Sequence, residues 1–366
     1  MRAFQVRNRL TYTVIINCAG MFATDNIPMK YKLSVLLYIC TFVYYNAYAE
    51  DAVIYQNSVT GRQVKATGTI ENFSRDELLL RTSSGQIKSI ETSSVVEVQA
   101  DYPSTYLEAK LRMNNQQFDQ ALSLLDKALV QAPDGWMKHE ILARQVECYS
   151  SLNRPDQAAV RYVQLIQLDP KSAFYDCVPL VWTSVELSPQ IQQSVQSWIR
   201  QQKYPYIALL GASLLLTTDK KTEVQTALNA LAKSDDADVA ALAQMQFNRL
   251  SLTPLSETAL KNLEKKADAL PRNLQYGPRF ILGQLWSRSS ADSSVKTDKA
   301  ALSYLQCAAN SKAPVELQAR AFYSAGSVLL NEGARDEAFR IFRRLIEKFP
   351  DSQWAQQAKR TAGGNL

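Results

Sequence analysis

Residues 118–133 read FDQALSLLDKALVQAP, and the spacing of side chains in this stretch returns at three later places in the chain. In each copy a proline follows an alanine by twelve residues, in the pairs Ala121/Pro133, Ala158/Pro170, Ala259/Pro271 and Ala338/Pro350. A large side chain stands four residues after each alanine, about one helical turn away: Leu125, Tyr162, Leu263 and Phe342. Because one amphipathic helix pair cannot bury its apolar face alone, this repetition predicts several stacked pairs.

Three stretches, residues 102–135, 139–172 and 319–352, resemble the tetratricopeptide repeat. The positions that carry the resemblance are small, aromatic or bulky residues and a final proline: Ala109, Phe118, Ala121, Leu125, Ala128 and Pro133; Leu142, Val146, Tyr149, Ala158, Tyr162, Leu165 and Pro170; and Phe322, Gly326, Leu329, Ala338, Phe342, Leu345 and Pro350. Val146 departs from the pattern, since the family has a smaller residue there. The resemblance implies antiparallel helix pairs that approach closely at the small residues, with proline ending the second helix.

Residues between these copies keep a helical spacing of apolar positions but leave the family pattern. We expect further helices, continuing the solenoid, at Ser172–Leu187, Pro189–Gln202, Tyr206–Thr217, Glu223–Ala232, Ala237–Leu250, Arg279–Ser287 and Lys299–Asn310. The polar stretch Ser289–Thr297 reads SSADSSVKT and predicts an exposed insertion. The run Tyr206–Leu216 is almost wholly apolar, but its eleven residues are too few to span a membrane and predict a buried helix.

Residues 52–100 show a period of two instead. Runs rich in β-branched residues alternate with short Ser, Thr, Asp and Gly clusters, which predicts five strands, at Ala52–Gln56, Val64–Glu71, Glu77–Thr82, Gln86–Glu91 and Val95–Gln99. In strand rhythm this stretch resembles SH3-like or Sm-like modules. We therefore predict a mainly α protein, in which a small all-β barrel at 50–101 precedes a tetratricopeptide-like α-solenoid at 102–366.

The segment from Met29 has the composition of a secretory signal peptide. It reads MKYKLSVLLYICTFVYYNAYA, with two lysines, an apolar run and an A-x-A box before Glu50. We expect 1–49 to be a leader, translation to start at Met29, and cleavage after Ala49. A lipid anchor at Cys40 is the alternative, although Tyr38 and Ile39 stand where small residues are needed. The mature chain is expected to be exported, periplasmic or extracytoplasmic, without a stable membrane span.

Composition argues against nucleic acid as the partner. The net charge of +6 comes largely from residues 1–49, which hold five basic residues and one acidic residue, so the remainder carries 36 basic and 34 acidic residues. A nearly neutral body offers no electrostatic footprint for a phosphate backbone. The mature chain keeps Cys148, Cys177 and Cys307, an odd number, which favours buried thiols over a disulfide framework.

Motifs of catalysis and cofactor binding are absent from the sequence. His139 is the only histidine, so a histidine metal cluster is excluded, and we expect it on the surface at the start of a helix. No G-x-x-x-x-G-K, G-x-G-x-x-G or G-x-S-x-G motif occurs. We therefore predict no cofactor and no enzymatic activity. An enzyme whose acid pair is not visible in the sequence remains an alternative.

The function that the resemblance implies is a scaffold for protein or peptide partners in the bacterial cell envelope. Such solenoids bind through a concave face built from the first helix of each pair, which implies partner-binding residues at Tyr106, Lys110, Asn114, Arg144, Glu147, Arg320, Tyr323 and Asn331. The alternative is a module for envelope polysaccharide or cell wall, in which Trp136, Trp182 or Trp354 would stack on sugars.

Overall fold

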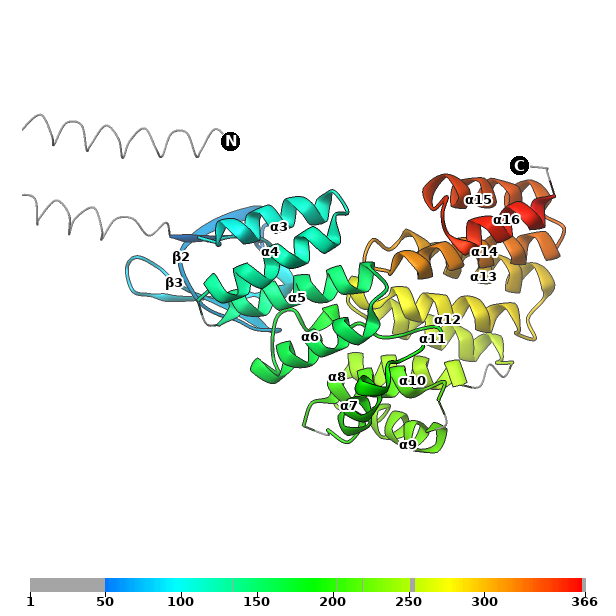
Figure 1. Ribbon diagram of the computed structural model, residues 1–366, viewed down its shortest axis with the longest axis horizontal. Coiled ribbons are helices and arrows are strands. Elements are labelled where there is room, and N and C mark those ends of the chain that lie inside the picture. Colours follow the sequence, from blue (N-terminus) through cyan, green and yellow to red (C-terminus); the bar gives the residue numbers. More distant parts are fainter. Residues whose placement is uncertain (1–49, 134, 202, 219, 251–253, 364–366) are drawn as a thin grey trace, which may run out of the picture.

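The computed structural model describes residues 50–133, 135–201, 203–218, 220–250 and 254–363. A five-stranded antiparallel β-sheet comes first, and a long series of α-helices follows (Figure 1). This confirms the predicted fold class, a mainly helical chain with a small β module at its start. The predicted leader and its cleavage site lie outside the described residues.

The sheet contains the five predicted strands in the order β4-β3-β2-β1-β5. Their bounds are β1 (Asp51–Gln56), β2 (Gln63–Phe73), β3 (Glu77–Arg81), β4 (Ile87–Glu91) and β5 (Val95–Gln99). Alternate residues on one face are buried, as the period of two requires: Val53, Ile70, Leu78, Leu80 and Ile90. These side chains share one apolar cluster with α3, α4 and α5, so the sheet is packed on the first helices.

The described helices run from Ser104 almost to the end of the chain. They are α3 (Ser104–Asn114), α4 (Phe118–Gln131), α5 (Trp136–Ser151), α6 (Pro155–Leu168), α7 (Pro189–Ile199), α8 (Pro205–Leu215), α9 (Lys221–Leu231), α10 (Ala237–Leu250), α11 (Glu257–Ala269), α12 (Tyr276–Ser287), α13 (Ser293–Ala309), α14 (Val315–Asn331), α15 (Arg335–Lys348) and α16 (Gln353–Ala362). Prolines stand in the first turn of α6, α7 and α8, where the missing N–H costs nothing.

The repeated small residues lie at helix contacts. Ala121, Ala158 and Ala338 are fully buried, and so are the bulky residues one turn later. A Cβ added at Gly326 in α14 would overlap the Phe342 ring in α15, and Gly283 in α12 has the same relation to Tyr304 in α13. The pair α12/α13 therefore repeats the packing of α14/α15. Ala259 in α11 differs, because it is only partly buried.

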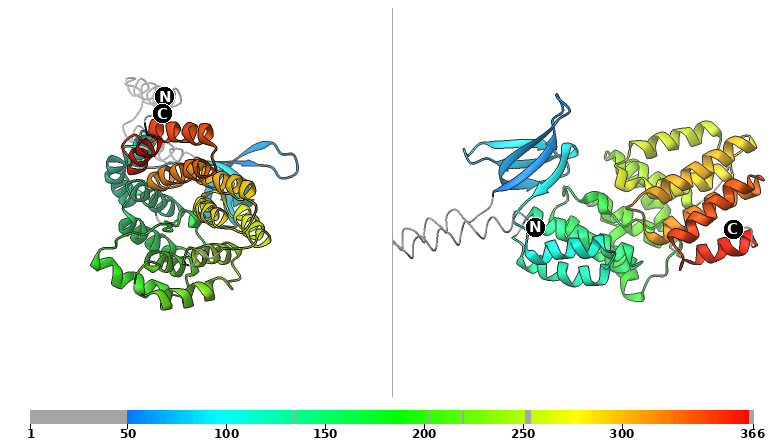
Figure 2. Two further views of the ribbon diagram at one scale, coloured as in Figure 1. Left: turned by 90° about the vertical axis from the view of Figure 1, so that its right-hand side faces the viewer. Right: turned by 90° about the horizontal axis from the view of Figure 1, so that it is seen from above.

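The helices follow a superhelical path. Figure 2 shows in its left panel that α3–α6, α7–α10 and α11–α16 lie around a common centre. Lys312, in the turn before α14, reaches Glu147 in α5 with an Nζ–Oε1 distance of 2.5 Å. Residues far apart in the sequence thus meet across the interior of one turn.

The predicted helix at Ser172–Leu187 is wrong. A short 3₁₀ turn, η2 (Tyr175–Cys177), is followed by a non-helical segment, residues 178–188, which we call the strap. Val178, Leu180, Val181 and Trp182 are all buried, so apolar residues occur on every side of the strap rather than on one helical stripe. Pro179 also lacks the N–H that a helix interior needs. The apolar spacing resembled that of a helix because the segment is enclosed by other helices.

The predicted exposed insertion at Ser289–Thr297 is corrected in part. Ser290, Asp292, Ser294 and Val295 are exposed as expected, but α13 begins within the stretch, at Ser293, and the residues at its two ends, Ser289 and Thr297, are buried. Cys148 and Cys307 are buried and free, and Cys177 is free and partly exposed. No helix among the described residues is long and apolar enough to cross a membrane.

Leucine-to-alanine substitutions on neighbouring helices test the predicted packing. Leu125 in α4 is fully buried, whereas Leu107 in α3 is 54% exposed. Leu125→Ala should lower the free energy of unfolding by about 2–5 kcal/mol because it leaves a cavity. Leu107→Ala should change it by less than about 0.5 kcal/mol. Urea denaturation of both variants measures the difference, and equal losses would contradict the packing described.

Candidate binding grooves inside the helical turn

The strap is held by side chains that replace the hydrogen bonds of a helix. Val181 donates its N–H to Ser213 Oγ at 3.3 Å, and its carbonyl accepts from Gln246 Nε2 at 3.0 Å and Arg249 Nη1 at 2.8 Å. Arg249 Nη2 donates to the carbonyl of Thr183 at 2.6 Å. Helices α8 and α10 therefore supply the partners that a buried irregular backbone requires.

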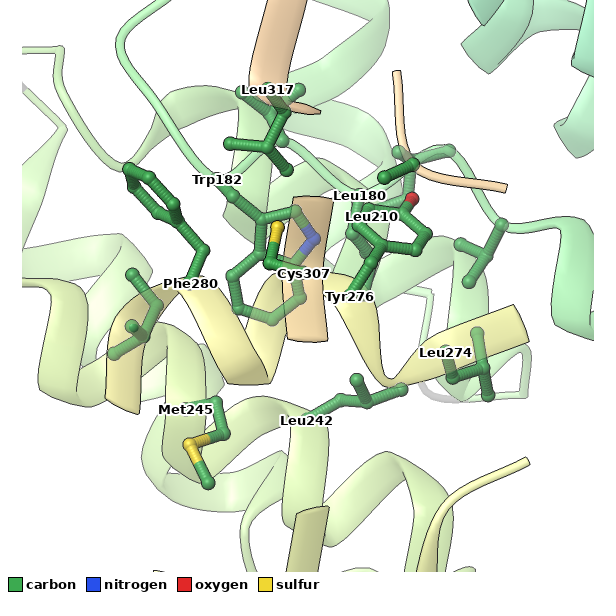
Figure 3. Packing of buried hydrophobic residues seen from close by; sticks show 14 of the residues in the cluster. Leu180, Trp182, Leu210, Leu242, Met245, Leu274, Tyr276, Phe280, Cys307 and Leu317 are labelled. Atoms are coloured by element: carbon green, nitrogen blue, oxygen red, sulfur yellow. The ribbon is translucent and has the colours of Figure 1, made fainter. Parts of the chain in front are cut away.

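Trp182 anchors the strap in the apolar core. Its indole lies among Leu180, Tyr276, Phe280, Cys307 and Leu317, as the close-up shows (Figure 3). The backbone of Gly277 in α12 approaches it so closely that an added Cβ would overlap the indole ring. A glycine is required at this position for space, because the tryptophan occupies the volume of any side chain.

A groove of about 700 Å³ lies between the strap and the C-terminal helices. We call it the strap groove. Its apolar surface comes from Leu180, Trp182, Tyr276, Leu317 and Trp354, and its charged residues are Arg154, Glu186, Glu316, Arg320 and Asp351. Glu316 Oε1 accepts from Trp354 Nε1 and Gln353 Nε2, both at 2.7 Å. The groove thus combines apolar walls with fixed polar groups, as binding sites in proteins commonly do.

The strap presents an extended backbone to this groove. Exposure alternates strictly from Thr183 to Ser188, with a period of two, which is the pattern of an extended chain. Within the described residues, the N–H and C=O groups of Ser184, Val185 and Glu186 make no hydrogen bond. These groups are free to pair with another extended chain.

A second cavity of about 340 Å³ adjoins the strap groove, and we call it the polar pocket. The two share Ser150, Pro179, Tyr276 and Pro314. Glu147 pairs there with Lys312 and with Arg144, and Asp176 Oδ2 accepts from Asn273 Nδ2 at 2.7 Å. Burial opposes ionisation of Glu147, but the charges of Arg144 and Lys312 hold its pKa below the usual value. Burial raises the pKa of Asp176.

A third cavity of about 400 Å³ lies on the other side of the strap, and we call it the arginine pocket. Arg249 and Arg320 line it together with Lys221, Gln284 and four hydroxyl residues: Thr183, Ser184, Thr217 and Thr218. It shares Trp182, Thr183, Ser184 and Arg320 with the strap groove, so the two cavities adjoin each other at these residues. No acidic side chain of the described residues lines it.

One predicted partner-binding residue, Tyr106, does not lie on a surface. It is fully buried in α3, stacks on Tyr102 with ring centroids 4.6 Å apart, and donates its hydroxyl to Glu140 Oε1 at 2.6 Å. Its position four residues before the exposed Lys110 placed it on the predicted groove. Because the sheet and α5 cover this part of α3, Tyr106 belongs to the core instead.

The other predicted residues are divided among several places, and their binding role stays a prediction. Asn114 and Glu147 line the polar pocket, and Arg320 lines both the strap groove and the arginine pocket. Arg144 is held by Glu147 and Glu140 beside the polar pocket. Lys110 and Asn331 are exposed, and Tyr323 stacks on Phe342 at 5.8 Å.

Burial also weighs against sugar binding by the tryptophans, and it corrects the predicted surface position of His139. Trp136 and Trp182 are 9% and 4% exposed, so neither can stack on a sugar, and Trp354 is tied to Glu316. His139 lies inside α5 with its side chain 13% exposed and its Nδ1 3.8 Å from Asp169 Oδ2, which corrects the predicted surface position. No cluster of three metal-ligating side chains occurs among the residues that the structure describes.

Sequence reasoning missed the strap, Arg249 and Lys312. The strap was hidden because buried apolar residues give the same spacing signal whether the chain is helical or extended. Pro179 and Pro189 at its two ends were the available signal of a non-helical segment. Arg249 and Lys312 are single cations that bind Thr183 and Glu147, which lie 66 and 165 residues away in sequence, so no local pattern marks these contacts.

Comparison with known families supports the helical repeat. Residues 320–352 match the family model of the tetratricopeptide repeat. The match begins in α14, includes all of α15 and ends just before α16. No curated protein matches the chain in a sequence comparison. The matched pair is the one in which Gly326 packs against Phe342, and members of this family are generally non-catalytic.

A double-mutant cycle tests the anchor of the strap. Gly277→Ala should lower the free energy of unfolding by about 1–3 kcal/mol because the new methyl group forces Trp182 to move. Trp182→Ala should cost about 3–5 kcal/mol by leaving a cavity. In the Trp182→Ala background the space is open, so Gly277→Ala should cost little, giving a coupling of about 0.5–3 kcal/mol in urea denaturation. Additive losses would mean that Gly277 and Trp182 are not in contact.

Proposed function

We propose that this protein is a non-catalytic scaffold that binds an extended segment of a protein partner in the strap groove. The observation that carries the proposal is the free, extended backbone of Ser184–Glu186 along a groove with apolar walls. Main-chain groups can supply affinity by pairing with the partner backbone, and the walls can receive alternate side chains. The tetratricopeptide match at 320–352 supports a protein partner, since α14 forms one side of the same groove.

The sequence adds a cellular place to this proposal. The segment 29–49 has the composition of a secretory signal, so we propose that the scaffold is exported and meets its partner in the bacterial cell envelope. The partner is a protein or peptide rather than a nucleic acid, in keeping with the nearly balanced charge of residues 50–366.

A tryptophan placed on the exposed edge of the strap tests the proposal. A library of linear peptides is displayed and selected on the wild type, and the enriched peptides are synthesised for affinity measurement. Ser184→Trp should fill the groove without disturbing the core, because Ser184 is exposed. We expect it to weaken binding by about tenfold or more, which is a loss of about 1.4 kcal/mol.

Ser194→Trp is the matched control. Ser194 lies exposed on α7, away from the three cavities described above, and the substitution adds the same bulk. It should leave peptide affinity unchanged. Peptides that bind Ser184→Trp as tightly as the wild type would show that the partner uses another surface, and failure to select any peptide would reject the proposed function.

A further inference from the structure

Two guanidinium groups line the arginine pocket without a salt bridge to any carboxylate of the described residues, although Glu316 lies near enough to Arg320 for its charge to act on it. In the neighbouring polar pocket, by contrast, Arg144 and Lys312 both pair with Glu147. Among the described residues, neither Arg249 nor Arg320 forms an ion pair with any carboxylate. Paired charges hold the structure together, so these two unpaired arginines need a separate explanation.

Arg249 is occupied by neutral acceptors only. Its guanidinium donates to the carbonyls of Val181, Thr183 and Ser213 and to the amide oxygen of Gln246. Carbonyl dipoles orient the group but leave its full positive charge. Burial, and after it the charge of Arg320, lower the pKa of Arg249 to about 10. The two arginines therefore repel each other in a partly dry site.

Arg320 has no hydrogen-bond partner among the described residues. Its guanidinium carbon lies 5.5 Å from the ring centroid of Phe280 and 5.2 Å from that of Trp354. Stacking on aromatic rings holds the planar group in place while its N–H donors stay free. Burial lowers the pKa of Arg320 as well, and interactions with Tyr304 and with the charge of Glu316 oppose that shift only in part. A fixed, half-buried guanidinium with unused donors is suited to bind an anion in bidentate fashion.

We propose that the arginine pocket binds one carboxylate of the partner segment that lies in the strap groove, through Arg320 and the positive charge of Arg249. This inference rests on the proposed function, because the groove delivers the carboxylate. The hydroxyl residues Thr183, Ser184, Thr217 and Thr218 and the amide of Gln284 line the same cavity and can donate further hydrogen bonds.

The charges of the strap groove decide which anion fits. Glu186, Glu316 and Asp351 line the groove outside the arginine pocket. Their repulsion disfavours a segment with acidic residues along its whole length, and it disfavours a phosphate backbone in the same way. The site therefore selects a largely neutral, apolar segment with one carboxylate at a fixed position. That carboxylate comes either from an Asp or Glu side chain or from the C-terminus of the partner.

Peptides selected on the wild type give the first test. Each acidic residue is replaced by its amide in one series, and the C-terminal carboxylate is amidated in another, so that the two sources are distinguished. One of these changes should weaken binding to the wild type by about tenfold or more. Arg320→Gln should abolish that preference, and Arg320→Lys should keep part of it because the charge remains.

Arg340→Gln is the matched control. Arg340 lies on α15 outside the three cavities, and its Nη2 lies 2.8 Å from Glu337 Oε1, so its charge is already paired. This variant should retain the full preference for the carboxylate peptide. If the wild type does not distinguish carboxylate from amide, or if Arg320→Gln distinguishes them equally well, the arginine pocket is not an anion site even though the groove binds peptides.

A second measurement does not need a peptide and decides the question if none is selected. Glutarate, a small dicarboxylate, is titrated against the wild type in thermal denaturation, with sodium chloride at matched ionic strength as reference. We expect glutarate to raise the Tm of the wild type and of Arg340→Gln by about 2 °C. Arg320→Gln should show no rise. If no peptide is selected, an equal response of all three proteins to glutarate, including no response, would overturn the proposal.

Discussion

A non-helical backbone buried inside a turn of helices is the constraint on which this structure depends. Polar backbone groups taken out of water must find hydrogen-bond partners, and an extended segment cannot supply its own. Ser213, Gln246 and Arg249 supply them for Val181 and Thr183, and these three residues come from α8 and α10. The strap in turn fills the centre with Trp182, so the surrounding helices pack on it as well as on one another.

The same part of the chain also ties the sheet to the helical body. Arg75, in the turn after β2, donates its N–H to the carbonyl of Lys171 and pairs with Asp236 and Asp238 at the start of α10. Phe73 packs edge-on against Phe174, with ring centroids 5.5 Å apart. The chain just before the strap therefore contacts the sheet, and the strap itself contacts α8, α10 and α12. The sheet therefore cannot shift far relative to the helices unless this segment moves with it.

The sequence predicted features that depend on residues close together in the chain, and it failed for features that depend on contacts with distant elements. Ala121, Leu125 and Pro133 predicted a packed helix and its end, because each acts within a few residues. The strap and Tyr106 were misread for one shared reason. Periodicity reports which residues are buried, but it does not report what buries them. Tyr106 is covered by the sheet, which precedes it in sequence, and by α5, which follows it, whereas the strap is covered by α8, α10 and α12.

Charge pairing distinguishes the polar pocket from the arginine pocket. In the polar pocket, Glu147 pairs with Arg144 and Lys312, which ties α5 to the turn before α14. Asp176 accepts a hydrogen bond from Asn273, which ties η2 to the turn before α12. In the arginine pocket, Arg249 and Arg320 share one cavity without a carboxylate from the described residues. An unpaired buried charge costs stability, and a chain that carries two side by side gives up stability that a ligand can restore. Because Arg249 also holds the strap, an anion that lowers this repulsion would stabilise the strap as well. If the proposed anion binds, Arg249 would therefore link its binding to the stability of the strap.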